Sequence, residues 1–530
     1  LNVTATTGNI TDTVALAVSG TTTLVTSADD ATITLDTTTN AFTGALTITT
    51  NDSSGTDADV TIDGGTTALI IAASTIDGDL TLTSGNSSGI TDSGTVTVGG
   101  NLSATTDANT GVITLNQMAV DGSFTLAPNS TGAVTIVNDA GLNLAASTMG
   151  GTFSGTATTG DITDSGALAI TGAATFITAA TGSNIVLDTS GNAFSNSVEM
   201  RADGGGEAFG NITFVDSAAI DFATSAGSNG DLFINGSTDG AVGGNLNVTA
   251  TTGNITDTVA LAVSGTTTLV TSADDATITL DTTTNAFTGA LTITTNDSSG
   301  TDADVTIDGG TTALIIAAST IDGDLTLTSG NSSGITDSGT VTVGGNLSAT
   351  TDANTGVITL NQMAVDGSFT LAPNSTGAVT IVNDAGLNLA ASTMGGTFSG
   401  TATTGDITDS GALAITGAAT FITAATGSNI VLDTSGNAFS NSVEMRADGG
   451  GEAFGNITFV DSAAIDFATS AGSNGDLFIN GSTDGAVGGN LNVTATTGNI
   501  TDTVALAVSG TTTLTTSAND ATITLDTTTN

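Results

Sequence analysis

The chain lacks several residue types on which common protein functions depend. Its 530 residues include no Cys, His, Lys, Trp or Tyr, and its only bases are Arg201 and Arg446. Without Cys there is no disulfide or thiolate metal site, and without His or Lys the usual bases and amine nucleophiles of enzymes are missing. Paired carboxylates remain, as glycosidases use them, but the composition argues against an enzyme.

Long apolar runs and strong helix formers are also scarce. No 18-residue apolar run occurs, so we expect no membrane-spanning helix and no membrane insertion. Thr, Ser, Asn, Asp and Gly dominate, and all of them disfavour helix interiors. Val, Ile and Leu nevertheless recur throughout, and only 10% of the residues are charged, which argues against disorder. The sequence therefore predicts a folded, all-β chain.

The chain is a tandem repeat with a period of 245 residues. Residues 246–490 repeat residues 1–245 without a visible change, and residues 491–530 begin a third copy. We treat these three ranges as the domain organisation and interpret the chain as a segment of a longer array. A weaker similarity lies inside the period, because AFTG at 41–44 matches AFSN at 193–196, 152 residues later. The 245-residue unit therefore grew from an older, shorter one.

Short segments of alternating apolar and polar residues recur inside each copy. Examples are Ile33-Thr-Leu35, Val60-Thr-Ile62 and Val96-Thr-Val98, and turn signals such as Asp77-Gly78 separate them. This period-two pattern predicts half-buried strands. A repeat of roughly 20–25 residues with two or three strands corresponds to one turn of an elongated parallel β-solenoid, with about ten turns per copy.

An array of β-sandwich domains is the alternative architecture. Such domains need about 100 residues each and usually bury an aromatic anchor. Aromatic residues are only 3% of this chain, and all of them are Phe. Nine Phe fall in each copy, and we expect them to stack in the core across successive turns.

The third copy predicts which side of one strand faces the core. Val25 is replaced there by Thr515, while the neighbouring Leu24 is kept as Leu514. An inward Thr would place an unpaired hydroxyl in the core, so Leu24 should point inward and Val25 outward. Asp29 becomes Asn519, which fits an exposed turn.

The net charge of −49 limits the choice of partners. Nucleic acid and anionic membranes should be repelled, whereas cations, basic surfaces or other copies bridged by divalent ions fit. Asp side chains in turns are the candidate Ca²⁺ ligands, since Ca²⁺ prefers oxygen. The candidates are Asp29, Asp30, Asp52, Asp57, Asp59 and Asp63. The alternative is that they are solvated turn residues that cap their own backbone, and the GGxGxD and EF-hand motifs are absent.

Glu199 and Arg201 form a second candidate site. They lie two residues apart in SVEMRADGGGE, so both side chains can project from one strand face. One hypothesis is a local ion pair. The other is a contact between neighbouring fibres that recurs once per copy.

The sequence of the predicted strands resembles that of a known group of proteins. GNLNVTATTGNITDTVALAVSG, from Gly244, and GTATTGDITDSGALAITGAATF, from Gly155, resemble the turns of filamentous-haemagglutinin-like adhesins and other giant bacterial β-solenoid surface proteins. The resemblance implies export, great length and a role in contact, but it supplies no binding residues. We therefore expect an extracellular or cell-surface structural filament, sheath or matrix fibre of a bacterium or archaeon that self-associates into fibres or bundles. The alternative is the stalk of a giant adhesin that meets a host or neighbouring cell surface. No cofactor beyond Ca²⁺ is implied.

Overall fold

The computed structural model describes the whole chain except residues 52, 54–56, 109, 203–209, 237, 297, 299–301, 354 and 448–454. The chain divides into two compact units, Leu1–Gly265 and Thr266–Asn530. The described residues form 65 strands and no helix. That part of the chain accordingly holds no helix long and apolar enough to cross a membrane.

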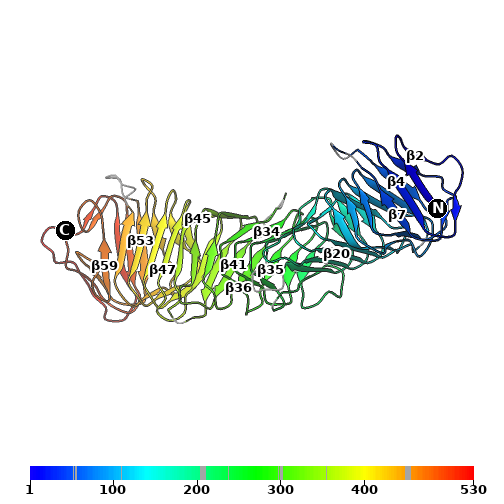
Figure 1. The fold of residues 1–530 in the computed structure, drawn as a ribbon. Coiled ribbons are helices and arrows are strands. Elements are labelled where there is room, and N and C mark those ends of the chain that lie inside the picture. Colours follow the sequence, from blue (N-terminus) through cyan, green and yellow to red (C-terminus); the bar gives the residue numbers. More distant parts are fainter. Residues whose placement is uncertain are drawn as a thin grey trace. The chain divides into compact units, whose positions relative to one another are not determined.

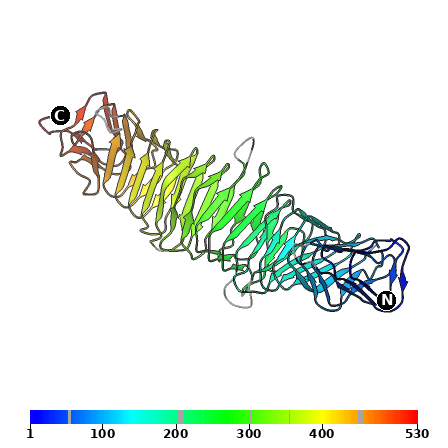
Figure 2. The ribbon, with the colours of Figure 1, turned by 45° about the horizontal axis from the view of Figure 1, so that its top comes forward.

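Each unit is a parallel β-solenoid, which confirms the predicted fold class (Figures 1 and 2). Strands from successive turns pair in parallel, so Leu24 pairs with Ile48 and Val98 pairs with Val120. The turns have about 22 residues, and the whole chain makes about 23 of them. Because no turn buries its apolar face alone, stacking of neighbouring turns creates the core.

Three runs of strands build the first unit. The first sheet contains β1 (Asn2–Ala5), β4 (Thr22–Thr26), β7 (Leu46–Thr49), β9 (Leu69–Ile71), β10 (Ser74–Ile76), β12 (Ile90–Asp92), β13 (Val96–Val98), β15 (Ile113–Val120), β17 (Val134–Asn138), β20 (Phe153–Ala157), β23 (Ala174–Thr178), β26 (Val198–Ala202), β28 (Ile220–Phe222), β29 (Asp231–Ile234) and β32 (Ile255–Asp257). The second contains β2 (Ile10–Thr11), β5 (Ile33–Leu35), β8 (Val60–Asp63), β11 (Leu80–Ser84), β14 (Leu102–Thr106), β16 (Ser123–Ala127), β18 (Leu142–Leu144), β21 (Ile162–Asp164), β24 (Ile185–Leu187), β27 (Ile212–Asp216) and β31 (Leu246–Ala250). Short strands on a third side are β3 (Ala17–Val18), β6 (Ala41–Phe42), β19 (Ser147–Met149), β22 (Leu168–Ile170), β25 (Ala193–Phe194), β30 (Ala241–Val242) and β33 (Ala262–Val263).

The second unit repeats these elements. Strands β34 (Thr267–Thr271) to β63 (Ala507–Val508) have the bounds of β4 to β33 shifted by 245 residues. The strands β64 (Thr512–Thr516) and β65 (Ile523–Thr524) then correspond to β4 and β5 once more. Identical amino-acid sequence thus gives the same local structure in both units.

The inward positions of the strands carry the core. On β4, Leu24 is 1% exposed while Val25 is only partly buried, which confirms the predicted orientation. Inward apolar residues stack on one another across turns, as Ile33, Val60 and Leu80 do in the second sheet. This stacking removes apolar surface from water at every turn, which stabilises the stack.

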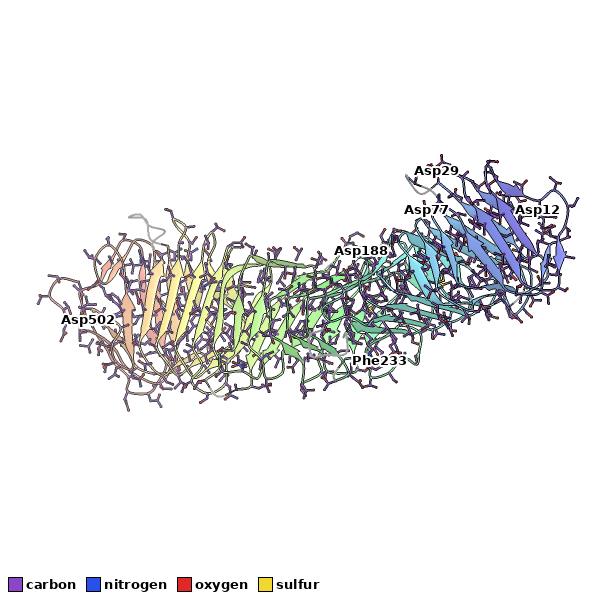
Figure 3. All side chains as sticks on the ribbon, in the orientation of Figure 1. Asp12, Asp29, Asp77, Asp188, Phe233 and Asp502 are labelled. Atoms are coloured by element: carbon purple, nitrogen blue, oxygen red, sulfur yellow. The ribbon has the colours of Figure 1, made fainter. Side chains whose placement is uncertain are left out.

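Phenylalanines stack across turns as expected. The ring centroids of Phe153 and Phe176 lie 5.1 Å apart, those of Phe176 and Phe194 6.0 Å, and those of Phe194 and Phe214 5.1 Å. These separations lie in the range of favourable aromatic pairs. Phe233 differs, because it is an outward, half-buried residue of β29 (Figure 3).

One turn of the first unit is longer than its neighbour because of an insertion. Val198 pairs with Leu232, 34 residues later, whereas Ala174 pairs with Val198 at an offset of 24. The longer turn contains the extra strand β28, which pairs with β29.

Candidate functional site

Polar side chains at the starts of the second-sheet strands bond successive turns together. Oδ1 of Asp59 accepts the backbone N–H of Asp79 at 2.8 Å, and Oδ1 of Asp79 accepts that of Asn101 at 2.6 Å. Oδ1 of Asn101 in turn accepts the N–H of Ser123 at 2.9 Å. Each of these residues lies directly before an inward strand residue in the sequence. We call this series of residues the side-chain ladder.

The side-chain ladder recurs further along the first unit. Asp161 accepts the N–H of Asn184 at 2.7 Å, Asn184 accepts that of Asn211 at 2.8 Å, and Asn211 accepts that of Asn245 at 2.7 Å. The second unit contains Asp406, Asn429, Asn456 and Asn490 in the same roles. Much of the Asp and Asn content therefore satisfies backbone donors between turns.

Buried Asn side chains form a second set of bonds between turns. Oδ1 of Asn192, which is fully buried, accepts the N–H of Leu168 at 2.9 Å. Its Nδ2 donates to Oδ2 of Asp164 at 2.6 Å. Asn40 bonds to Leu16 and Asp12 in the same way. Sequence reasoning missed these residues, although Asn precedes both Ala-Phe pairs that revealed the older repeat.

Three of the six candidate Ca²⁺ ligands lie at exposed turn positions with other bonds. Oδ2 of Asp29 accepts the hydroxyl of Ser53 at 2.8 Å. Asp30 follows in the left-handed region with φ of 58°, as a turn residue. Asp57 is exposed, and its carbonyl accepts the N–H of Asp59 at 2.9 Å.

The remaining candidates are Asp59, Asp63 and Asp52. Asp59 belongs to the side-chain ladder, and Oδ1 of Asp63 accepts the N–H of Gly65 at 2.7 Å. Burial raises the pKa of Asp63, the bond from Gly65 opposes this, and nearby acids add to the increase. Asp52 lies outside the described residues. The described residues contain no group of three or more acidic side chains that could hold a metal ion. Ca²⁺ binding at the candidate residues stays a prediction.

Glu199 and Arg201 project from the outward face of β26. Val198, Met200 and Ala202 are buried, whereas Glu199 is half-buried and Arg201 is exposed. Oε1 of Glu199 accepts a bond from Nδ2 of Asn235 at 2.6 Å. The shared face is therefore confirmed, and the ion pair between the two residues stays a prediction.

One buried acid was not expected. Asp216 at the end of β27 is 2% exposed, and its Oδ1 accepts the N–H of Phe194 at 3.0 Å. Burial raises the pKa of Asp216, although backbone N–H bonds oppose the increase. Asp461 has the same position and the same direction of shift in the second unit. This acid bonds turns together inside the core.

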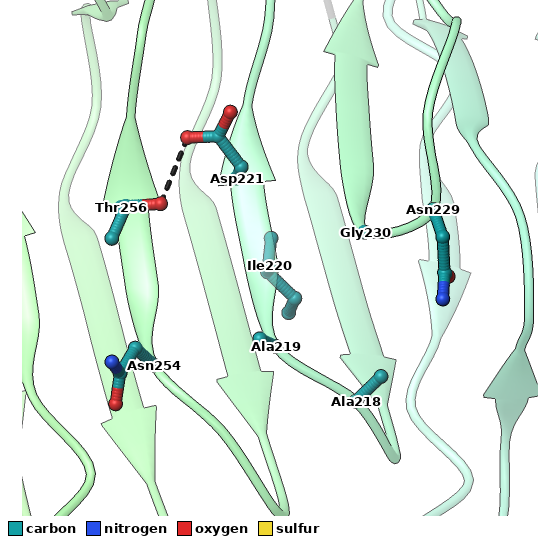
Figure 4. Close-up of a pocket in the computed structure, with 8 residues that line it drawn as sticks. All are labelled: Ala218, Ala219, Ile220, Asp221, Asn229, Gly230, Asn254 and Thr256. Carbon is teal, nitrogen blue, oxygen red and sulfur yellow. Dashed lines mark hydrogen bonds between the residues drawn. The ribbon is translucent and has the colours of Figure 1, made fainter.

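The insertion in the long turn borders a shallow cavity of about 320 Å³ (Figure 4). Asp221 of β28 lines it, and its two carboxylate oxygens accept hydroxyl bonds from Thr256 at 2.8 Å and Thr258 at 3.2 Å. Asp231 pairs opposite Asp221 on β29, and its Oδ2 accepts the N–H of Ser228. Both carboxylates are thus engaged in bonds within the solenoid, and no nucleophile with an adjacent base is found among these described residues.

A family model described as "Repeats of unknown function (DUF5649)" matches most of the sequence. The matched segments are 1–49, 57–127, 131–201, 209–294, 302–372, 376–446 and 454–530. The chain belongs to this family. Segments start at 57, 131 and 209 and again at 302, so three family repeats make one 245-residue copy. The starts at 57 and 209 are two family repeats and 152 residues apart, the same spacing as the two Ala-Phe pairs, so the shorter unit inside each copy is the family repeat.

Searches of curated proteins and of solved structures found no match to the chain. The family and the fold thus define the protein as a repeat-containing β-solenoid. Such repeat folds are typically structural rather than catalytic.

Proposed function

We propose that the chain forms an extracellular structural fibre, sheath or matrix filament. The observation that carries the proposal is the use of polar side chains. In the side-chain ladder and at Asn192, carboxylates and amides bond one turn to the next. An enzyme would gather such carboxylates and amides into one active site. Here they are spread along the stack, and their hydrogen bonds stabilise it.

The repetition of the surface supports a fibre. Residues 1–245 and 246–490 present the same outward residues, because the two copies are identical. Identical surfaces offer identical contacts at every copy, which suits lateral assembly. A net charge of −49 over about 23 turns is about two negative charges per turn, which favours solubility and disfavours nucleic acid or anionic lipid as partners.

Imaging of the native material by electron microscopy tests this proposal. We expect ordered bundles, tubes or sheets on the outside of the cell. Single stalks that end in a globular head would instead favour the adhesin stalk. A dispersed protein inside the cell would refute both functions.

A further inference from the structure

We propose that the outward face around Arg201 is a lateral docking site for a second copy of this chain. The inference rests on the proposed function and names the residues through which fibres would associate. The site, called the Arg201 patch, consists of Ile177, Glu199, Arg201 and Phe233.

The register of three successive strands places these residues side by side. Ile177 of β23 pairs with Arg201 of β26, and Glu199 pairs with Phe233 of β29. All four occupy outward positions. Ile177, Glu199 and Phe233 are half-buried there, and Arg201 is exposed. Most outward strand positions carry Thr or Ser instead, as on β11 and β14. The second unit repeats the patch at Ile422, Glu444, Arg446 and Phe478.

Charge complementarity favours a second copy as the occupant. The chain carries 51 acidic residues and only two bases, so two copies repel each other over most of their surface. The Arg201 patch is the place in each 245-residue copy where a positive charge can meet the other chain. Half-buried Ile177 and Phe233 add apolar area next to that charge, as in the centre of protein interfaces.

The patch is self-complementary in one orientation. Glu199 and Arg201 are two residues apart on one strand, which separates their Cα atoms by about 6.6 Å. Consider a two-fold axis in the interface that runs parallel to the direction in which the strands stack and passes midway between Glu199 and Arg201. This axis sets Arg201 of each copy against Glu199 of the other. A two-fold axis along the strand would instead set Arg201 against Arg201. The geometry therefore predicts a local two-fold contact between copies that stack in the same direction.

A hydrogen bond within the chain orients the carboxylate of Glu199 before this contact forms. Nδ2 of Asn235 donates to its Oε1 at 2.6 Å, which fixes the carboxylate on the outward face. Asn480 and Glu444 form the same bond in the second unit. Because the carboxylate is already oriented, less conformational entropy is lost when the partner's Arg201 binds.

Charge reversal tests the two-fold contact in the full 530-residue chain. One variant, E199R/E444R, makes both patches basic, and the other, R201E/R446E, makes them acidic. Each variant alone should associate about tenfold more weakly than the wild type in sedimentation velocity at 0.15 M NaCl, because like charges then face each other. An equimolar mixture of the two variants should regain association.

Control variants place charges of the same sign outside the patch. T97R/T342R and T97E/T342E alter exposed outward positions of β13 and β43 and change the net charge by two units, against four for each patch variant. Each control should associate more strongly than the patch variant of the same sign. Thermal melts by circular dichroism verify that each variant is folded. If E199R/E444R associates more strongly than the wild type and than T97R/T342R, Arg201 docks on a general acidic surface and the two-fold contact is refuted.

The remaining outcomes distinguish this inference from the proposed function. If the wild type assembles and every patch variant assembles equally well, the docking site is wrong but the fibre stands. If the wild type stays monomeric and native material shows no bundles, both are refuted.

Discussion

Replacement of two neighbouring residues by the same amino acid tests the orientation of a strand. Leu269 on β34 is fully buried, whereas Val270 is half-buried. The variants L269T and V270T introduce the same β-branched residue with the same backbone preference. The equivalent of Val270 is already Thr515 in the third copy.

The expected costs differ because the environments differ. Loss of a buried Leu side chain costs about 2 kcal/mol of burial, and an unpaired buried hydroxyl costs about 1–3 kcal/mol more. L269T should therefore lower the free energy of unfolding by about 4 kcal/mol. V270T changes a partly solvated position and should cost less than about 1 kcal/mol.

Urea denaturation followed by circular dichroism measures both variants. Because turns of a repeat protein can open locally, hydrogen exchange of the amides in β34 and β37 (Leu291–Thr294) should accompany it. Equal destabilisation by the two variants, or a larger effect of V270T, would refute the assigned orientation.

Three further predictions concern polar groups. In urea melts, D79A should cost about 1–2 kcal/mol because it removes the acceptor for the Asn101 N–H, whereas D79N should cost little; equal losses would show that the acceptor is unimportant. Burial raises the pKa of Asp216 in the folded chain, so its stabilising contribution is complete below the unfolded pKa and is lost as pH rises through the folded pKa. The melting temperature should therefore fall as the pH rises above about 4, the ordinary Asp pKa, less steeply with Asp216 and Asp461 both changed to Asn, and an unchanged slope would contradict this. In thermal melts and light scattering, millimolar Ca²⁺ should raise the melting temperature or bundle the chains, because a chain of net charge −49 recruits divalent ions; an equal effect of NaCl at matched ionic strength would show plain screening and refute specific Ca²⁺ sites.

The fold could be predicted because the apolar pattern is local and repeats. Alternation around Leu24 and Val25 defines an inward and an outward face without knowledge of distant contacts. The absence of helix formers and the repeat of turn signals then leave few architectures that bury these faces. The Phe stack followed from the same reasoning, because inward residues of successive turns meet.

The polar sites could not be predicted as well, because they depend on register between turns. Asp59 and Asp79 look like solvated turn residues in the sequence, and only their alignment 20 residues apart shows the bond. Sequence reasoning also assumed that Thr is excluded from inward positions, because its hydroxyl would be unpaired in the core. Yet Thr22 is fully buried with an unpaired Oγ1, while Thr26 donates to the Ala31 carbonyl. The cost of such a group thus depends on neighbours that the sequence does not reveal.

Disulfide cross-linking between engineered cysteines tests the parallel solenoid most directly. The chain has no native Cys, and Thr81 of β11 pairs in register with Ser103 of β14, which pairs with Thr125 of β16. Adjacent strands lie about 4.8 Å apart, within the Cα separation that a disulfide spans. The account predicts that T81C/S103C forms an intramolecular disulfide on mild oxidation, whereas T81C/T125C, two turns apart, does not. Efficient cross-linking of T81C/T125C with none in T81C/S103C would contradict the solenoid.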